Sequence, residues 1–114
     1  MSKSQRTKGH SFERRIAQDM IECGFKEARR QLEYNAQDAN GIDLQETGRF
    51  KIQCKAMKKQ PNIVSVMKEI KCLEDDIPVV VFKVDNSGTF ATLRWSDTKT
   101  LISLFNYISK KVDF

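Results

Sequence analysis

Three polar side chains with complementary chemistry, Asp43, Gln53 and Lys55, lie in the short stretch GIDLQETGRFKIQCK. Carboxylate and amide oxygens such as theirs are ligands for a hard divalent cation like Mg²⁺, which keeps several of its waters when bound. A lysine beside such a cation can position an attacking water or stabilise the charge that develops on a phosphate. The trio therefore has the composition of a cation-dependent site that hydrolyses phosphate esters.

The hydrophobic pattern of the same stretch predicts how these side chains meet. Residues 42–44 and 50–55 each alternate between apolar and polar types, which is typical of two half-buried strands. The Thr47–Gly48 connection predicts a hairpin turn. Since successive side chains point to opposite faces, Gln53 and Lys55 share the polar face, with the aspartate on the neighbouring strand. The competing interpretation is an ordinary amphipathic hairpin, because this spacing is a loose pattern.

A further carboxylate, Glu13, lies in a region that the sequence predicts to be helical. Ser11 is a suitable N-cap and Gly24 a suitable C-terminal residue for a helix over Phe12–Cys23. At about 100° per residue, Glu13 falls within the arc formed by the apolar residues Phe12, Ile16, Ala17, Met20 and Ile21. An unpaired carboxylate there would cost several kcal/mol or become protonated. We therefore expect a metal or a lysine beside it, or alternatively an arginine at the edge of the core.

These residues carry a resemblance to a known family. Residues 41–55 resemble the PD-(D/E)XK nuclease motif, with Asp43 as the first acidic residue and Gln53-Cys54-Lys55 in the place of (D/E)-X-K. The segment KGHSFERRIAQDMIECGF is similar to the first helix of archaeal-type Holliday junction resolvases and their phage relatives, and ARR, PVVVFKVD and LRWSD extend the similarity over most of the chain. There are two departures. Gln53 replaces the usual Glu or Asp, as in some Mrr-like restriction nucleases, and Ile42 replaces the Pro.

The resemblance implies an α/β fold: a single-domain restriction-endonuclease-like core with a mixed β-sheet flanked by helices. A basic N-terminal arm would cover residues 1–9 and the nuclease domain residues 10–114. The implied activity is a Mg²⁺-dependent, structure-selective DNA endonuclease, with Mn²⁺ as a substitute: a Holliday junction resolvase of DNA recombination and repair that cuts branched DNA in paired nicks. The implied catalytic residues are Glu13, Asp43, Gln53 and Lys55. The implied metal ligands are Glu13, Asp43, Gln53 and the backbone carbonyl of Cys54.

Two other functions remain open from the sequence. The first is a restriction- or repair-type nuclease that acts on duplex DNA. The second is a non-catalytic DNA-binding domain of the same fold, in which Gln53 has removed the activity. Metal-dependent cleavage separates the enzymes from the binding domain.

The charge distribution favours a nucleic-acid partner. The chain carries a formal net charge of +5, and Lys and Arg outnumber Asp and Glu in residues 1–30 and 51–71. Basic segments around an acidic centre are expected of a site that binds phosphates around a metal, although a solvated basic surface is the simpler alternative. The candidate DNA-binding residues are Lys3, Arg6, Lys8, Arg14, Arg29, Arg30, Lys58 and Lys59.

The remaining elements follow from periodicity and turn residues. We expect a short strand around Ala28–Leu32, a helix over Ile63–Leu73, a buried strand at Val79–Phe82, a strand at Phe90–Arg94 and a helix from Ser96 or Asp97 to Ile108. Asp38 is a loop residue that could join the site, although a turn role fits it better.

The C-terminal part has more apolar residues than one small domain needs. Trp95, the strand Val79–Phe82 and the helix Leu101–Ile108 offer material for core packing or for contact with a partner subunit. A four-way junction has two strands to cut, and a twofold homodimer would place two identical sites against it. We therefore expect a homodimer.

The composition excludes several other classes. The chain has one histidine and three cysteines without a CxxC pair, which argues against a zinc site and a disulfide framework and favours a reducing compartment. No apolar run is long enough to span a bilayer, and the N-terminus lacks the apolar region of a signal peptide. We expect no membrane association and a location in the cytoplasm of a prokaryotic or phage-infected cell.

Overall fold

The chain begins with a long helix, α1 (Lys3–Glu22). The computed structural model describes residues 3–32 and 40–112, without the side chains of residues 3–7. Our prediction that the helix starts at Phe12, with Ser11 as its cap, was wrong. Gln, Arg and Lys, which favour helices, continue it toward the N-terminus. An ion pair of 2.8 Å between Lys8 and Asp85 fastens this extension to the distant end of a strand.

The C-terminal end of α1 has the predicted glycine cap. Gly24 has a φ of +113°, and its N–H donates to the carbonyl of Ile21, while the N–H of Phe25 donates to the carbonyl of Met20. This pair of bonds is the Schellman arrangement, which satisfies the last carbonyls of a helix. The cap turns the chain toward the short strand β1 (Arg29–Arg30).

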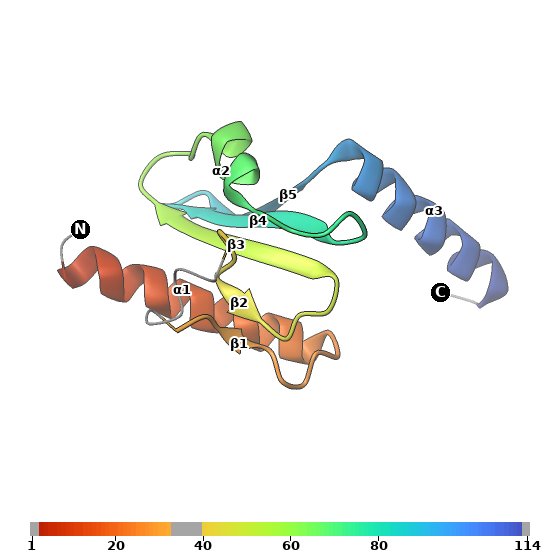
Figure 1. Ribbon diagram of the computed structural model, residues 1–114, viewed down its shortest axis with the longest axis horizontal. Coiled ribbons are helices and arrows are strands. Elements are labelled where there is room, and N and C mark those ends of the chain that lie inside the picture. The colour runs from red at the N-terminus through yellow and green to blue at the C-terminus, as the bar shows by residue number, and fades with distance from the viewer. Residues whose placement is uncertain (1–2, 33–39, 113–114) are drawn as a thin grey trace.

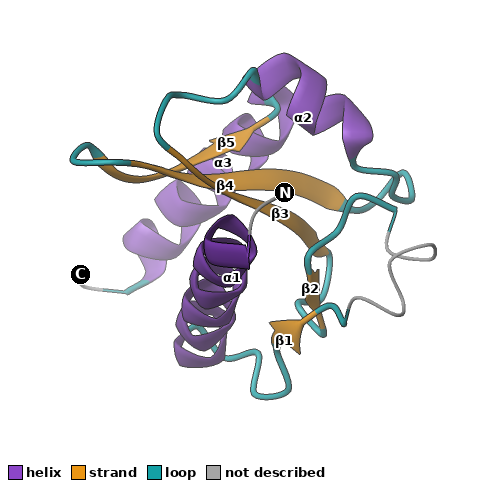
Figure 2. Ribbon diagram, turned by 90° about the vertical axis from the view of Figure 1, so that its left-hand side faces the viewer, coloured by secondary structure: helices purple, strands orange, loops and turns teal. Residues whose placement is uncertain are grey.

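A mixed three-stranded sheet forms the centre of the molecule, as predicted. Its strands are β3 (Phe50–Met57), β4 (Ile77–Val84) and β5 (Gly88–Leu93), with β3 and β4 parallel and β4 and β5 antiparallel. The crossover between β3 and β4 contains α2 (Ile63–Glu69). Figure 1 shows α1 on one face of the sheet and α2 on the other, and Figure 2 shows the same layers from the side.

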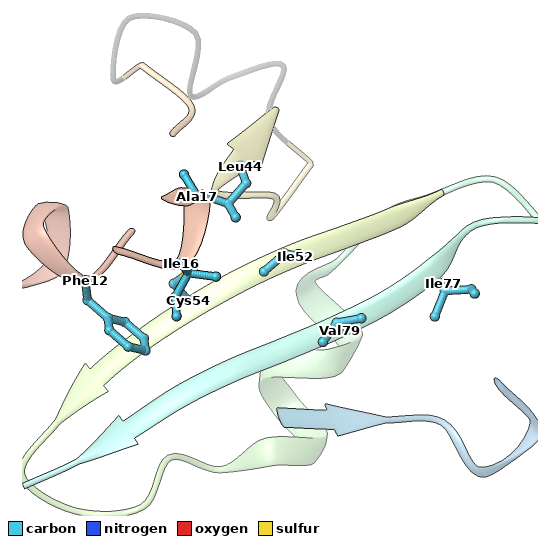
Figure 3. Close-up of a cluster of buried hydrophobic side chains, with 8 residues drawn as sticks. All are labelled: Phe12, Ile16, Ala17, Leu44, Ile52, Cys54, Ile77 and Val79. Atoms are coloured by element: carbon cyan, nitrogen blue, oxygen red, sulfur yellow. The ribbon is translucent and has the colours of Figure 1, made fainter. Parts of the chain in front are cut away.

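Two small cores fill the layers. Alternate residues of β3 and β4 pack against α1 in the cluster of Phe12, Ile16, Ala17, Leu44, Ile52, Cys54, Ile77 and Val79 (Figure 3). The intervening residues Val80 and Phe82 pack against Val66 and Ile70 of α2. Both faces of β4 are therefore covered, which confirms the prediction from its continuous apolar run. The same burial excludes Val79–Phe82 as part of a subunit interface.

The predicted hairpin is only partly formed. Strand β2 (Leu44–Gln45) pairs with β1 in a separate two-stranded sheet and not in the ladder of β3. The turn itself is present: the N–H of Phe50 donates to the carbonyl of Thr47 (3.1 Å), and Gly48 has a φ of +62°. The left-handed conformation of Glu46 (φ +61°) interrupts regular pairing between the two arms.

Helix α2 is shorter than predicted. It begins after the N-cap Asn62, whose side chain accepts from the N–H of Ser65, but it ends at Glu69 instead of Leu73. The next residues leave the helix because the N–H of Lys71 donates to the carbonyl of Asn40 (2.8 Å). A contact with a distant loop therefore replaces the last helical turn.

The C-terminal helix α3 (Trp95–Lys111) projects away from the sheet (Figure 1) and contains no buried residue. It begins one residue before the predicted caps and extends three residues beyond Ile108. Trp95 is 68% exposed, so it is not part of the core of this chain. The radius of gyration is 14.9 Å, compared with about 13 Å for a compact domain of this length. Within the described residues, no helix is long and apolar enough to cross a membrane.

Candidate functional site

Asp43 lies immediately before β2, where three hydrogen bonds hold it. Its carboxylate Oδ2 accepts from the backbone N–H of Cys54 at 2.8 Å. Its own N–H donates to the carbonyl of Ile52 at 2.8 Å, and its carbonyl accepts from the N–H of Gln31 at 2.6 Å. The carboxylate is therefore fixed against the edge of β3 that faces away from β4.

The same edge carries the predicted peptide ligand. In an extended strand, the N–H and C=O of one residue point to the same side. Because the N–H of Cys54 points toward Asp43, its carbonyl lies on that side as well. Burial raises the pKa of the Cys54 thiol, and the charges of Asp43 and Glu13 raise it further. The thiol is thus protonated at neutral pH, and the carbonyl is the donor that Cys54 offers to a cation.

Gln53 and Lys55 point to the opposite face of β3, as predicted, but this face is not an open polar surface. Helix α2 covers it, and Gln53 is only 6% exposed. The Nε2 group of Gln53 donates to Oε2 of Glu69 at 3.1 Å. Its Oε1 atom is buried and has no hydrogen-bond partner among the described residues. Lys55 is half-buried on the same face.

Burial and three charged side chains shift the pKa of Asp43. Burial is the main cause that raises the pKa of Asp43 from 3.8 to about 6, although the bond from the Cys54 N–H opposes it. The negative charges of Glu13 and Glu69 raise this pKa further, and the positive charge of Lys55 lowers it. The charges of Glu13, Glu69 and Lys55 therefore act on Asp43, and Gln53 is hydrogen-bonded to one of these residues, Glu69.

Glu13 has the arginine partner that was one of the predicted alternatives. Its Oε2 accepts from Nε of Arg30 at 3.2 Å, and both side chains are only 16% exposed. The prediction that this carboxylate needs a partner is confirmed. A metal as a further partner remains a prediction.

The donors fit a hard cation. Carboxylate, amide and peptide oxygens suit Mg²⁺ and Mn²⁺ better than zinc or copper, and Asp43, Gln53 Oε1 and the Cys54 carbonyl supply one of each. No three His, Cys, Asp or Glu side chains in residues 3–32 and 40–112 converge closely enough to hold a metal by themselves. A cation here would therefore depend on the amide and peptide oxygens in addition to the carboxylates.

The basic residues predicted to contact DNA are distributed around the molecule. Arg14, Arg29, Lys58 and Lys59 are exposed, and Arg29 donates to the carbonyl of Glu27 at 3.2 Å. Lys8 and Arg30 are engaged in the ion pairs with Asp85 and Glu13. The side chains of Lys3 and Arg6, and all of Asp38, lie outside the described part of the chain.

Sequence reasoning missed one residue of this cluster, Glu69. A signal was present, because Glu69 is the sole acidic residue in the basic segment 51–71. In addition, the helix that connects two parallel strands must pack against a face of the sheet. Which residue of the helix would reach Gln53 could not be predicted without the length of the crossover and the angle of the helix.

Comparisons with protein-family models, with curated proteins and with solved structures find no match.

Proposed function

We propose that this protein is a metal-dependent DNA endonuclease that cuts branched DNA, with the Holliday junction as its substrate and a homodimer as its active form. One observation carries the proposal. The buried carboxylate of Asp43 is fixed to the N–H of Cys54, on the strand from which the unsatisfied Gln53 Oε1 and the Lys55 ammonium project. The order of these residues is that of the D, (D/E)-X-K motif that the sequence resembles, with Gln53 in place of the second acidic residue. The cytoplasm, where prokaryotic and phage DNA recombines, is the proposed location.

Each group has a role in phosphodiester hydrolysis. Asp43, Gln53 Oε1 and the Cys54 carbonyl would hold the cation, with Glu13 as an outer carboxylate. A bound Mg²⁺ supplies a nucleophile at neutral pH and neutralises charge on the phosphate. Lys55 places a positive charge where the phosphate becomes more negative in the transition state, and it can orient the attacking water. Arg14, Arg29, Lys58 and Lys59 would contact the backbone, because phosphate contacts dominate DNA affinity.

Two substitutions test the proposal. Asp43→Ala and Lys55→Ala should each reduce the cleavage of a four-way junction by at least about 100-fold, because each removes a group that acts in the chemical step. Both variants should bind the junction almost as tightly as the unsubstituted protein. Lys51→Ala is the matched control, since Lys51 lies on the same strand but donates to the carbonyl of Gly48 at 2.9 Å. Cleavage by Asp43→Ala at the original rate would exclude this site.

A non-catalytic DNA-binding domain is the second candidate, favoured by the pairing of Glu13 with Arg30 and by the neutral Gln53. Such a domain would retain its DNA affinity in EDTA and would cut no DNA with Mg²⁺ or Mn²⁺. A panel of junction, flap, duplex and single-stranded DNA, each with and without cation, separates it from the resolvase and from a nuclease of linear duplex.

A further inference from the structure

Glu69 is the last residue of α2, and its carboxylate reaches β3. Its Oε2 atom accepts the hydrogen bond from Nε2 of Gln53 at 3.1 Å. Although Glu69 is exposed at the surface, it therefore contacts a side chain that is 6% exposed. The hydrogen bond between Glu69 and Gln53 therefore depends on the position of the C-terminal end of α2 over β3.

The loop that carries Asp43 is attached to the same helix end. The N–H of Lys71 donates to the carbonyl of Asn40 at 2.8 Å. Gly41 lies so close that a Cβ built on it would stand 2.2 Å from the carbonyl oxygen of Glu69. The φ of Gly41 is +75°, which also favours glycine. Asp43 and Glu69 are thus held in one unit by backbone contacts.

The Gln53 amide connects this unit to the strand. An amide has a donor end and an acceptor end, and Glu69 occupies the donor end. The acceptor, Oε1, is buried without a partner among the described residues. Leaving such an atom unsatisfied costs about 1–3 kcal/mol. A cation bound next to Asp43 would supply the missing partner.

We propose that Glu69 provides, from α2, the negative charge that Gln53 lacks on β3, and that its carboxylate orients the Gln53 amide so that Oε1 faces the cation. Glu69 is thus a positioning residue that acts through Gln53. This inference rests on the cation site of the proposed function and assigns it a member outside the sequence motif.

The test measures cation binding without DNA. Isothermal titration of the full chain with Mn²⁺ would compare the original protein with Glu69→Gln, which can keep the hydrogen bond but loses the charge. We expect a dissociation constant raised about 10-fold or more. Glu74→Gln is the matched control, because Glu74 is exposed in the loop after α2. The double variant Gln53→Glu/Glu69→Gln returns the carboxylate to β3 and should restore the affinity.

The outcomes distinguish this inference from the proposed function. If Glu69→Gln binds Mn²⁺ as the original protein does, while Asp43→Ala does not bind it, the role of Glu69 is wrong and the nuclease proposal stands. A second outcome also contradicts the inference. If Glu69→Gln loses affinity for Mn²⁺ and the double variant does not recover it, at an unchanged melting temperature, then Glu69 does not supply the charge that Gln53 lacks. If the original protein binds no Mn²⁺ at millimolar concentration and cuts no DNA, both proposals fail.

Discussion

At the scale of single residues, two polar groups of the candidate site lower the stability of the fold. A buried carboxylate with a raised pKa and a buried amide oxygen without a partner both destabilise the protein when no cation is bound. Buried polar residues that destabilise a fold are typical of functional sites. Asp43 and Gln53 can therefore be tested by stability measurements that need no substrate.

The first prediction concerns Asp43 and pH. The pKa of Asp43 is about 6 in the folded protein and 3.8 in the unfolded chain. In EDTA, between about pH 4 and 6, the folded protein therefore keeps a proton on Asp43 that the unfolded chain has released. The free energy of unfolding should therefore fall as the pH rises through this window, by at most about 3 kcal/mol. Asp43→Asn should remove this fall. Urea denaturation from pH 4 to 7 measures it, and superimposable profiles for the two proteins would contradict the prediction.

The second prediction concerns the amide of Gln53. Gln53→Met has a similar shape but no polar group, so it removes the unsatisfied Oε1 at the expense of one hydrogen bond to Glu69. We expect the free energy of unfolding in EDTA to rise by about 1 kcal/mol. The proposed cation site also predicts that Mn²⁺ raises the melting temperature of the original protein, and Gln53→Met should lose this increase. A variant that is destabilised by more than about 2 kcal/mol would show instead that the amide is structural.

At the scale of elements, the site depends on the backbone contacts between the end of α2 and the loop before β2. We call these contacts, between Asn40 and Lys71 and between Gly41 and Glu69, the joint. β3 presents Gln53 and Lys55, the loop presents Asp43, and the end of α2 presents Glu69. Their alignment depends on the close contact of Gly41 with the Glu69 carbonyl. Any side chain at Gly41 must move the loop away from the helix or change its backbone conformation.

Gly41→Ala tests this joint. A methyl group would lie against the backbone of Glu69, and alanine is strained at a φ of +75°, so we expect a loss of stability of about 2 kcal/mol or more. The matched control is Gly24→Ala, where φ is +113° but nothing beyond the adjoining residues lies within 4 Å of the added carbon. That control should cost only about 1 kcal/mol and leave cleavage unchanged. Equal losses of stability in the two variants would argue against a tight joint at Gly41.

At the scale of the whole molecule, α3 is the feature that a single copy leaves unexplained. Leu104, Phe105 and Val112 are each more than half exposed and Ile108 is 40% exposed, and at about 100° per residue these four side chains share one face of the helix. An exposed apolar patch of this kind is typical of a surface that contacts another protein. A second copy packed on α3 would place two candidate sites in one assembly, as the paired nicks of the proposed function require.

We therefore predict that Leu104→Glu and Ile108→Glu convert a dimer to a monomer. Because α3 contains no buried residue, neither change should lower the stability of the sheet domain. Asn106→Glu, which changes the charge on the opposite side of the helix, should leave the dimer intact. Light scattering at micromolar concentration measures the mass, and a junction-cleavage gel should show single instead of paired nicks for the monomer. A monomeric original protein, even with junction DNA present, would refute the dimer.

The sequence by itself determined which faces meet. The alternation of residues 50–55 predicted that Ile52 and Cys54 face the core and that Gln53 and Lys55 face the other way, and the structure confirms both. The glycine cap of α1 and the doubly covered strand Val79–Phe82 also follow from the sequence. Such features are local, because steric limits on the backbone and the period of each element set them within a few residues.

Only the tertiary structure decided which distant segment packs against each helix and strand. The start of α1 at Lys3, the end of α2 at Glu69 and the pairing of β2 with β1 each accompany contacts with distant segments. The meeting of Glu69 with Gln53 depends on the angle at which a crossover helix packs, which no periodicity encodes. The pKa of Asp43 has the same origin, because burial and nearby charges are produced by the folded chain as a whole.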